Sequence, residues 1–185
     1  TGVIATTGMQ RTNIKFNGMM TPFTKLKVGV AMNYADINVN DFPDEAGNTA
    51  FFRAVYETPP SYNLKGKPFA EETNPYQQIL FRAGQNNPYW IIENNSRNNC
   101  TARTYGNLFL EYQLAEGLKA TYRVGLDNFN TKIETYDELG TGPAGRTNPP
   151  SGGRFLLQTQ QETQLNSNFF LSYDKELDRK STRLN

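Results

Sequence analysis

The sequence predicts an all-β fold, an antiparallel up-and-down meander of about five long strands. Three observations support this fold class. Five stretches alternate apolar and polar residues, short turns join the first pair and the second pair of these stretches, and long connections separate the others. A strand turns successive side chains to opposite faces, so a period of two indicates strands with one apolar and one polar face.

The clearest stretch runs from residue 103 to residue 130. Leu108 and Leu110 share one face of its first arm, and Val124 and Leu126 share one face of its second arm. The opposite face carries polar residues, among them Asn107 and Glu111 on the first arm and Arg123 and Asp127 on the second. The three residues Ala-Glu-Gly at 115–117 are short enough for a hairpin, because glycine adopts a positive φ at no steric cost.

The same pattern places all five strands. We expect them at residues 10–20, 26–38, 102–113, 118–136 and 155–173, paired antiparallel in sequence order. A tight turn containing Pro22 joins the first two strands, as proline favours turns. The second and third strands pair across a long connection, which no local signal fixes.

Two long loops interrupt the alternation, at residues 39–99 and 138–153. The first is rich in asparagine, proline and aromatic residues, and residues 49–57 are expected to form a short helix that ends before Pro59. Long connections are often functional. Amides bond hydroxyl groups and flat rings stack on apolar faces, so Asn87, Tyr89 and Trp90 are candidate ligand-binding residues for glycan or peptide. In the alternative interpretation, the aromatic side chains of the loop only pack against other parts of the same loop. These residues are Tyr89, Trp90, Phe51 and Phe52.

Composition excludes several kinds of chemistry. The net charge of +1 gives no field that attracts nucleic acid. The chain has no histidine and one cysteine, Cys100, which excludes Ser-His-Asp and Cys-His catalysis, a Cys/His zinc site and an internal disulfide. We therefore expect no catalytic residues, no metal and no cofactor. No apolar run is long enough for a membrane helix, and the first residues do not form a signal peptide.

Strand length and loop asymmetry favour a partial transmembrane β-barrel over residues 1–177. About ten residues of tilted strand cross a bilayer. Outer-membrane barrels have short turns at one end and long loops at the other, with an aromatic girdle. Here Phe23, Tyr112 and Tyr173 are expected in such a girdle. The polar face would line a water-filled lumen with charged residues: Lys15, Lys27, Glu111, Arg123 and Asp127.

A soluble sandwich with one polar face is the alternative reading of the same alternation. The two readings differ in the surroundings of the apolar face. In a barrel, ten apolar residues lie on the convex side and are exposed when no lipid is present, whereas in a sandwich a second sheet buries them. These ten are Ile14, Phe16, Val28, Val30, Leu108, Leu110, Val124, Leu126, Phe169 and Leu171.

Five segments, in this order, also resemble the barrel of SusC/RagA-type TonB-linked outer-membrane transporters. They are MQRTNIKFNG at 9–18, LKVGVAMNY at 26–34, NNPYWI at 86–91, YGNLFLEY at 105–112 and ATYRVGLD at 120–127. The resemblance implies import of nutrients, typically glycans or peptides, across the outer membrane. It also implies a SusD-like surface lipoprotein and the TonB complex as partners of the full-length protein.

The family's plug domain and TonB box have no counterpart here, and five strands do not close a barrel of this class. We therefore expect an internal barrel fragment. Residues 178–185 break the strand pattern and are expected to be a non-native tail.

Two other functions remain as alternatives to transport. One is a soluble or surface β-domain that binds glycan through the loop of Tyr89 and Trp90. The other is a hydrolase, which needs two carboxylates about 5–10 Å apart. Glu111 and Asp127 fall on one face of neighbouring strands, but such carboxylates are more often salt-bridged, here to Arg123 or Lys119. We expect no enzymatic activity.

Overall fold

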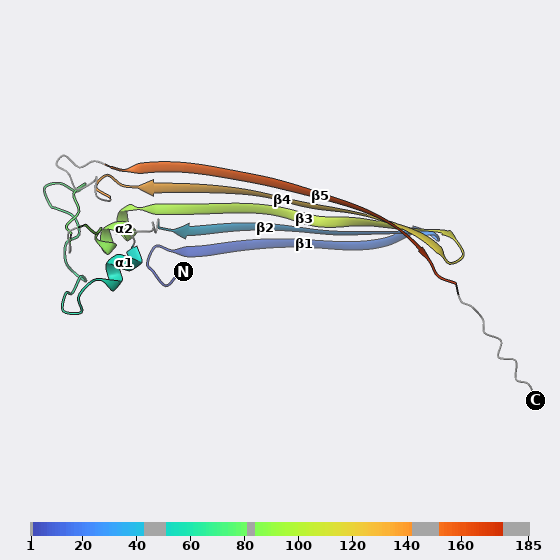
Figure 1. Ribbon diagram of the computed structural model, residues 1–185, viewed down its shortest axis with the longest axis horizontal. Coiled ribbons are helices and arrows are strands. Elements are labelled where there is room, and N and C mark those ends of the chain that lie inside the picture. The colour runs from blue at the N-terminus through green and yellow to red at the C-terminus, as the bar shows by residue number, and fades with distance from the viewer. Residues whose placement is uncertain (1, 43–50, 81–83, 142–151, 176–185) are drawn as a thin grey trace, which may run out of the picture. The chain divides into compact units, whose positions relative to one another are not determined.

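Five long antiparallel strands form one sheet in the order β1-β2-β3-β4-β5, which confirms the predicted meander (Figure 1). The computed structural model describes residues 2–42, 51–80, 84–141 and 152–175. The strands are β1 (Gly8–Phe23), β2 (Leu26–Asp41), β3 (Ser96–Ala115), β4 (Leu118–Asp137) and β5 (Arg154–Tyr173). Among the described residues, β1 and β5 are the edge strands of this sheet.

The strands are longer than the alternation alone indicated. β2 continues to Asp41, and β3 begins at Ser96, six positions before the expected start. Residues 96–101 are mostly polar, so they carry no apolar alternation, and hydrogen bonding to neighbouring strands makes them part of the sheet. Strand thus occupies both ends of the segment that was expected to be loop at residues 39–99.

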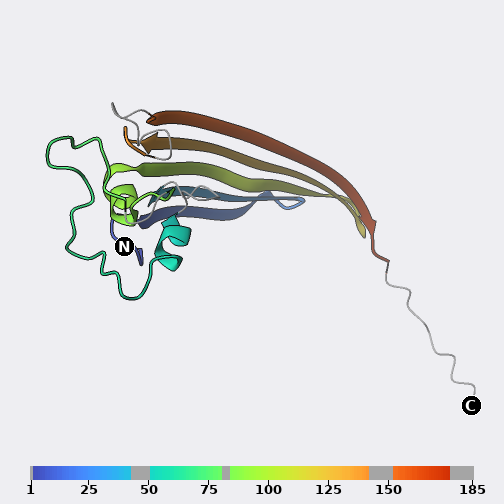
Figure 2. The ribbon, with the colours of Figure 1, turned by 60° about the vertical axis from the view of Figure 1, so that its left-hand side comes forward.

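The rest of the first loop contains two short helices, α1 (Phe51–Tyr56) and α2 (Pro88–Asn94). Helix α1 lies within the expected helix at 49–57. Helix α2 was not expected. Figure 2 shows both helices beside the long connection between them. Neither described helix has the length and apolar content needed to cross a membrane.

The chain divides into two compact units, and each strand contributes residues to both. The loop-side unit comprises Thr1–Thr12, Asp36–Ala102 and Asn130–Gln161, and the turn-side unit comprises Asn13–Ala35, Arg103–Phe129 and Glu162–Asn185. Both helices belong to the loop-side unit, and the two short strand turns belong to the turn-side unit. The predicted tail at 178–185 and most of the second loop, residues 142–151, lie outside the described residues.

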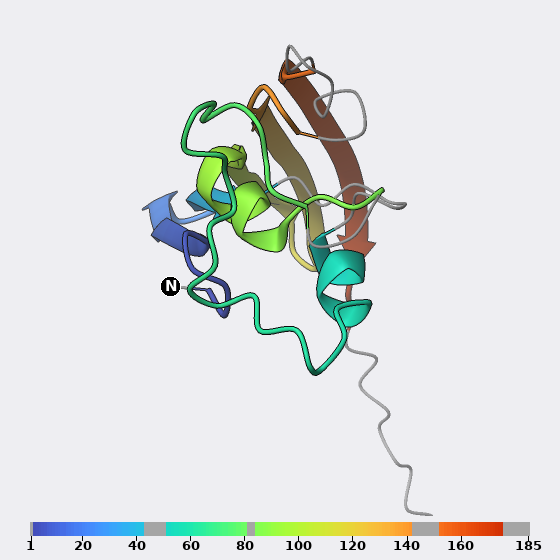
Figure 3. The same cartoon turned by 90° about the vertical axis from the view of Figure 1, so that its left-hand side faces the viewer.

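A small apolar core holds the loop-side unit together. Phe42, at the end of β2, and Phe51 of α1 place their ring centroids 4.7 Å apart, and both are buried with Ile91 of α2. Ile4 and Ile92 pack against this cluster. The end of β2, α1 and α2 therefore contribute to one core. Figure 3 shows the two helices from the loop side.

In the turn-side unit, side-chain contacts define two faces of the sheet. A Cβ atom at Gly18 would contact the side chains of Phe16 and Val30, so these three residues share one face. The ring of Phe109 fills the space where a Cβ of Gly29 would lie, so these two residues share the other face. Across β4 and β5, Ser167 Oγ donates to Tyr122 Oη at 2.9 Å. Together with strict alternation, such contacts assign even positions of β1 to β4 and odd positions of β5 to one face. We call this the apolar face, and the opposite one the polar face.

The apolar face does not lie against a second described layer. None of the ten apolar residues expected on it is buried. Six are exposed, namely Ile14, Phe16, Leu108, Leu126, Phe169 and Leu171, and four are half-buried among their neighbours, namely Val28, Val30, Leu110 and Val124. The closed hydrophobic core of a sandwich is therefore absent around these residues.

Candidate functional site

The predicted binding residues Asn87, Tyr89 and Trp90 lie at the start of α2 in the loop-side unit. Asn87 is the N-cap of this helix, and its Oδ1 accepts a hydrogen bond from the backbone N–H of Tyr89 at 3.0 Å. Pro88 occupies the first turn, where its missing N–H costs nothing. The segment N-P-Y-W thus begins a helix because its first two residues form an N-cap and a preset first turn.

Trp90 is fully buried, with 0% of its surface exposed. Its indole Nε1 donates to Thr141 Oγ1 at 3.0 Å, which connects α2 to the segment after β4. Thr141 Oγ1 in turn donates to Asn95 Oδ1 at 3.0 Å. The indole face is therefore enclosed by protein in this structure, and a sugar ring does not reach it without movement of the loop.

Asn87 is also buried, and its amide is used internally. Its Nδ2 donates to the backbone oxygen of Ile79 at 2.8 Å, while its backbone N–H donates to Gln78 Oε1 at 2.8 Å. These contacts give Asn87 a capping and bridging role. Tyr89 is half-buried, and it is the member of the three whose side chain remains partly open to solvent.

Gln78 is the centre of a buried polar network that sequence reasoning missed. Its Nε2 donates to Asn86 Oδ1 at 2.8 Å and to the backbone oxygen of Gly140 at 2.6 Å. Because its Oε1 also accepts from Asn87, one side chain joins three parts of the unit. Buried polar groups are normally satisfied in this way. No sequence pattern distinguishes Gln78 from the adjacent Gln77.

Helix α1 contributes to the core and to the surface. Phe51 and Ala54 are buried, whereas Phe52, Val55 and Tyr56 are exposed. Phe52 still contacts Phe51, at 5.3 Å between ring centroids. The expected packing of the loop aromatics is therefore present for Phe51 and Trp90. Contact of Tyr89, Trp90 or Asn87 with a ligand stays a prediction.

Tyr136 lies next to the last residue of β4, in the loop-side unit, close to the hydrogen bonds that hold α2. Its Oη donates to Glu138 Oε2 at 2.8 Å, and this hydrogen bond to a carboxylate raises the pKa of the Tyr136 phenol. The backbone N–H of Glu138 donates to Asn95 Oδ1 at 3.1 Å. The first residues after β4 are thereby attached to the end of α2.

In the turn-side unit, the polar face carries paired charges. Arg103 contacts both carboxylate oxygens of Asp127, at 2.9 Å for Nε to Oδ1 and 2.5 Å for Nη2 to Oδ2. Arg123, expected as a partner of Asp127, instead lies 5.8 Å from the ring centroid of Phe170 on β5. Arg103 reaches Asp127 from the neighbouring strand, whereas Arg123 lies four residues away on the same strand, about 13 Å along it, so Asp127 pairs with Arg103.

Asp127 thus has an ion-pair partner, and Glu111 lines a separate hollow with lysines. Within the described part of the chain, no group of three or more acidic or cysteine side chains gathers as metal ligands. Cys100 is an exposed free thiol on β3. The arrangement offers charge pairing and hydrogen bonding along the polar face.

No protein-family model matches the chain, and no curated protein matches it.

Proposed function

We propose that the chain is a section of the wall of an outer-membrane TonB-dependent transporter, with the loop-side unit as part of its extracellular surface. The proposed cargo is a glycan oligosaccharide or a peptide taken into the periplasm. A SusD-like lipoprotein and the TonB complex are the proposed partners of the full-length protein. We infer these two partners from the resemblance of the five sequence segments to SusC/RagA-type transporters.

The single observation that supports this proposal best is the distribution of charge between the two faces of the turn-side unit. Every charged side chain of its strands lies on the polar face, including Lys15, Lys27, Glu111, Arg123 and Asp127. The apolar face in the same unit has none, although it is open to solvent across all five strands. A lipid-exposed barrel wall has this arrangement because a charge in hydrocarbon is costly.

A second observation is the division of the connections. Two residues separate β1 from β2, and two separate β3 from β4, all in the turn-side unit. The connections after β2 and β4 belong to the loop-side unit. Short periplasmic turns and long outer loops are typical of outer-membrane barrels.

The glycan-binding alternative receives less support. It uses the loop of Tyr89 and Trp90, and Trp90 is enclosed and hydrogen-bonded to Thr141, which leaves the half-buried Tyr89 as the aromatic ring of the pair that a sugar can reach. It also leaves the exposed apolar face without a role, since contiguous apolar patches of this kind normally face a partner or a membrane.

Site-directed labelling tests the membrane part of the proposal. With Cys100 replaced by serine, the full-length protein would receive Leu108→Cys or Asn107→Cys. These neighbours on β3 lie on opposite faces. A polarity-sensitive fluorophore at 108 should be quenched by spin-labelled lipid, and one at 107 by aqueous iodide. Quenching of both by iodide would overturn the membrane proposal.

Uptake tests the transport part. Cells with and without the full-length protein would be fed mixed oligosaccharides and peptides, and the remaining solutes measured by mass spectrometry. Cells with the protein should deplete one solute class faster, and a protonophore should remove the difference. Identical depletion in both strains contradicts a transport role.

A further inference from the structure

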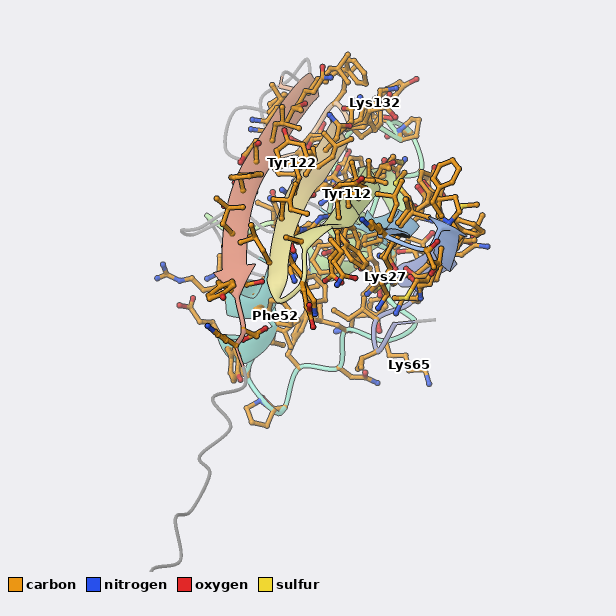
Figure 4. All side chains as sticks on the ribbon, turned by 90° about the vertical axis from the view of Figure 1, so that its right-hand side faces the viewer. Lys27, Phe52, Lys65, Tyr112, Tyr122 and Lys132 are labelled. Atoms are coloured by element: carbon orange, nitrogen blue, oxygen red, sulfur yellow. The ribbon has the colours of Figure 1, made fainter. Side chains whose placement is uncertain are left out.

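Several charged residues of the polar face gather around one hollow rather than in ion pairs. This hollow, of about 170 Å³ in the turn-side unit, is lined by three lysines and one carboxylate, Lys25, Lys27, Lys119 and Glu111. Lys27 is labelled in Figure 4. These residues come from the turn before β2, from β2, from β3 and from β4. Three positive charges and one negative charge leave a surplus of two positive charges.

The remaining polar side chains of this lysine hollow also supply hydrogen-bond donors. They are the hydroxyl groups of Thr21 and Thr24 and the amide of Gln113. The backbone N–H of Gln113 donates to the oxygen of Lys25 at 2.9 Å, which holds the first turn against β3. Of the lining groups, only Glu111 is an acceptor without donors when ionised. Among the charged groups of the lining, three ammonium groups only donate and one carboxylate only accepts, so donors outnumber acceptors there.

These donors are not used up by contacts within the described residues. The ion pairs found there involve Arg53, Arg103, Lys132 and Arg154, and none involves a lysine of the hollow. Along the polar face, Arg103 is matched by the carboxylate of Asp127 and Arg123 lies against the ring of Phe170, whereas the three lysines of the hollow gather around one open space. Lysine is a flexible point charge with three donors, which suits a small oxyanion.

We propose that the lysine hollow is a binding site for a divalent oxyanion, with phosphate as the representative ligand. The surplus of two positive charges matches a dianion better than a monovalent carboxylate or chloride. Glu111 sets the strength of the site by offsetting one ammonium group. This proposal concerns the polar face alone, so it stands or falls independently of the transporter proposal.

Phosphate titration at constant ionic strength tests the site. The 185-residue chain, with its exposed apolar face covered by detergent micelles, would be titrated with inorganic phosphate at pH 7.5, and backbone amide chemical shifts near Lys25 and Gln113 measured by NMR. Lys27→Gln and Lys119→Gln should each raise the Kd for phosphate roughly two- to fivefold, which corresponds to the free energy of an exposed ion pair. Glu111→Gln should strengthen binding by roughly the same factor.

Lys15→Gln is the matched control, because Lys15 lies on the polar face of β1 outside the lysine hollow. It makes the same charge change and should leave the phosphate Kd unchanged. An equal effect of Lys15→Gln would overturn the site in favour of a diffuse charge effect. Weaker or unchanged binding in Glu111→Gln, or equal affinity for acetate and phosphate, would overturn it as well. Far-UV circular dichroism checks the fold, and the separate lysine variants keep the test valid should one misfold.

Discussion

Gln78 shows how much of the loop-side unit depends on one side chain. It is 5% exposed and lies in the connection between the two helices. Its amide contacts Asn86 and Asn87 before α2 and Gly140 after β4. The loop is therefore ordered by polar contacts as well as by the small core around Phe42, and those contacts position the start of α2.

We predict that Gln78→Leu loosens α2. The substitution leaves the N–H of Asn87 and the C=O of Gly140 without their partner, and each buried group left unpaired costs about 1–3 kcal/mol. Hydrogen exchange of the α2 amides should accelerate accordingly. Gln77→Leu is the control, because the hydrogen bonds of Gln77 to Glu71 and Asn74 use its backbone. Equal protection of α2 in both variants would contradict the network.

Asn87 and Trp90 were singled out from the sequence for their chemistry, and the structure gives them capping and packing contacts. The signal for this role was present in the sequence. An asparagine followed by proline is a typical N-cap and first helical position, and the pair predicts a helix start. The burial of Trp90 depends on Thr141, fifty-one residues away, and no local pattern specifies that contact.

At the scale of the strand, adjacent residues of β4 lie on opposite faces of the sheet and therefore in different surroundings. Val124 is half-buried on the apolar face, and Arg123 is exposed on the polar face near Phe170. In a bilayer, the first residue would meet hydrocarbon and the second a wet lumen. Substitutions at these two adjacent positions therefore test which face of β4 contacts lipid.

We predict that Val124→Arg destabilises the full-length protein in bilayers more than Arg123→Val. A charge at the bilayer midplane of such a barrel costs about 2–4 kcal/mol. Loss of an exposed cation–π contact costs about 0.5–1 kcal/mol. Both variants would be refolded into lipid vesicles and titrated with denaturant. The opposite order of free energies would mean that the polar face contacts lipid, or that the sheet is not in a membrane.

At the scale of the whole chain, the described sheet ends in two edge strands of 16 and 20 residues, β1 and β5. Long edge strands offer unpaired N–H and C=O groups that recruit further strands. The apolar side chains next to these edges are exposed, for example Phe16 on β1 and Phe169 on β5. The chain therefore has both an open hydrogen-bonding edge and an uncovered apolar surface.

We predict that this 185-residue chain self-associates in aqueous buffer and becomes monodisperse in detergent. Sedimentation velocity measures both states. A triple variant with Leu165→Lys, Phe169→Lys and Leu171→Lys, all exposed on β5, should reduce association in buffer, because charge on an edge strand opposes pairing. A monomeric chain in detergent-free buffer would show that these edges and the apolar face do not drive association.

The sequence by itself determined that there are five strands, roughly where each lies in the chain, and which residues share a face. Alternation is a local property, so residues such as Leu108 and Val124 could be assigned to one face from their spacing alone, and short turns fixed two of the pairings. Tertiary structure alone decided the pairing of β2 with β3 across the long connection, the partner of Asp127 and the enclosure of Trp90. Those outcomes depend on contacts between residues far apart in the chain, and the geometry of such contacts is set only when the whole sheet and its loops assemble.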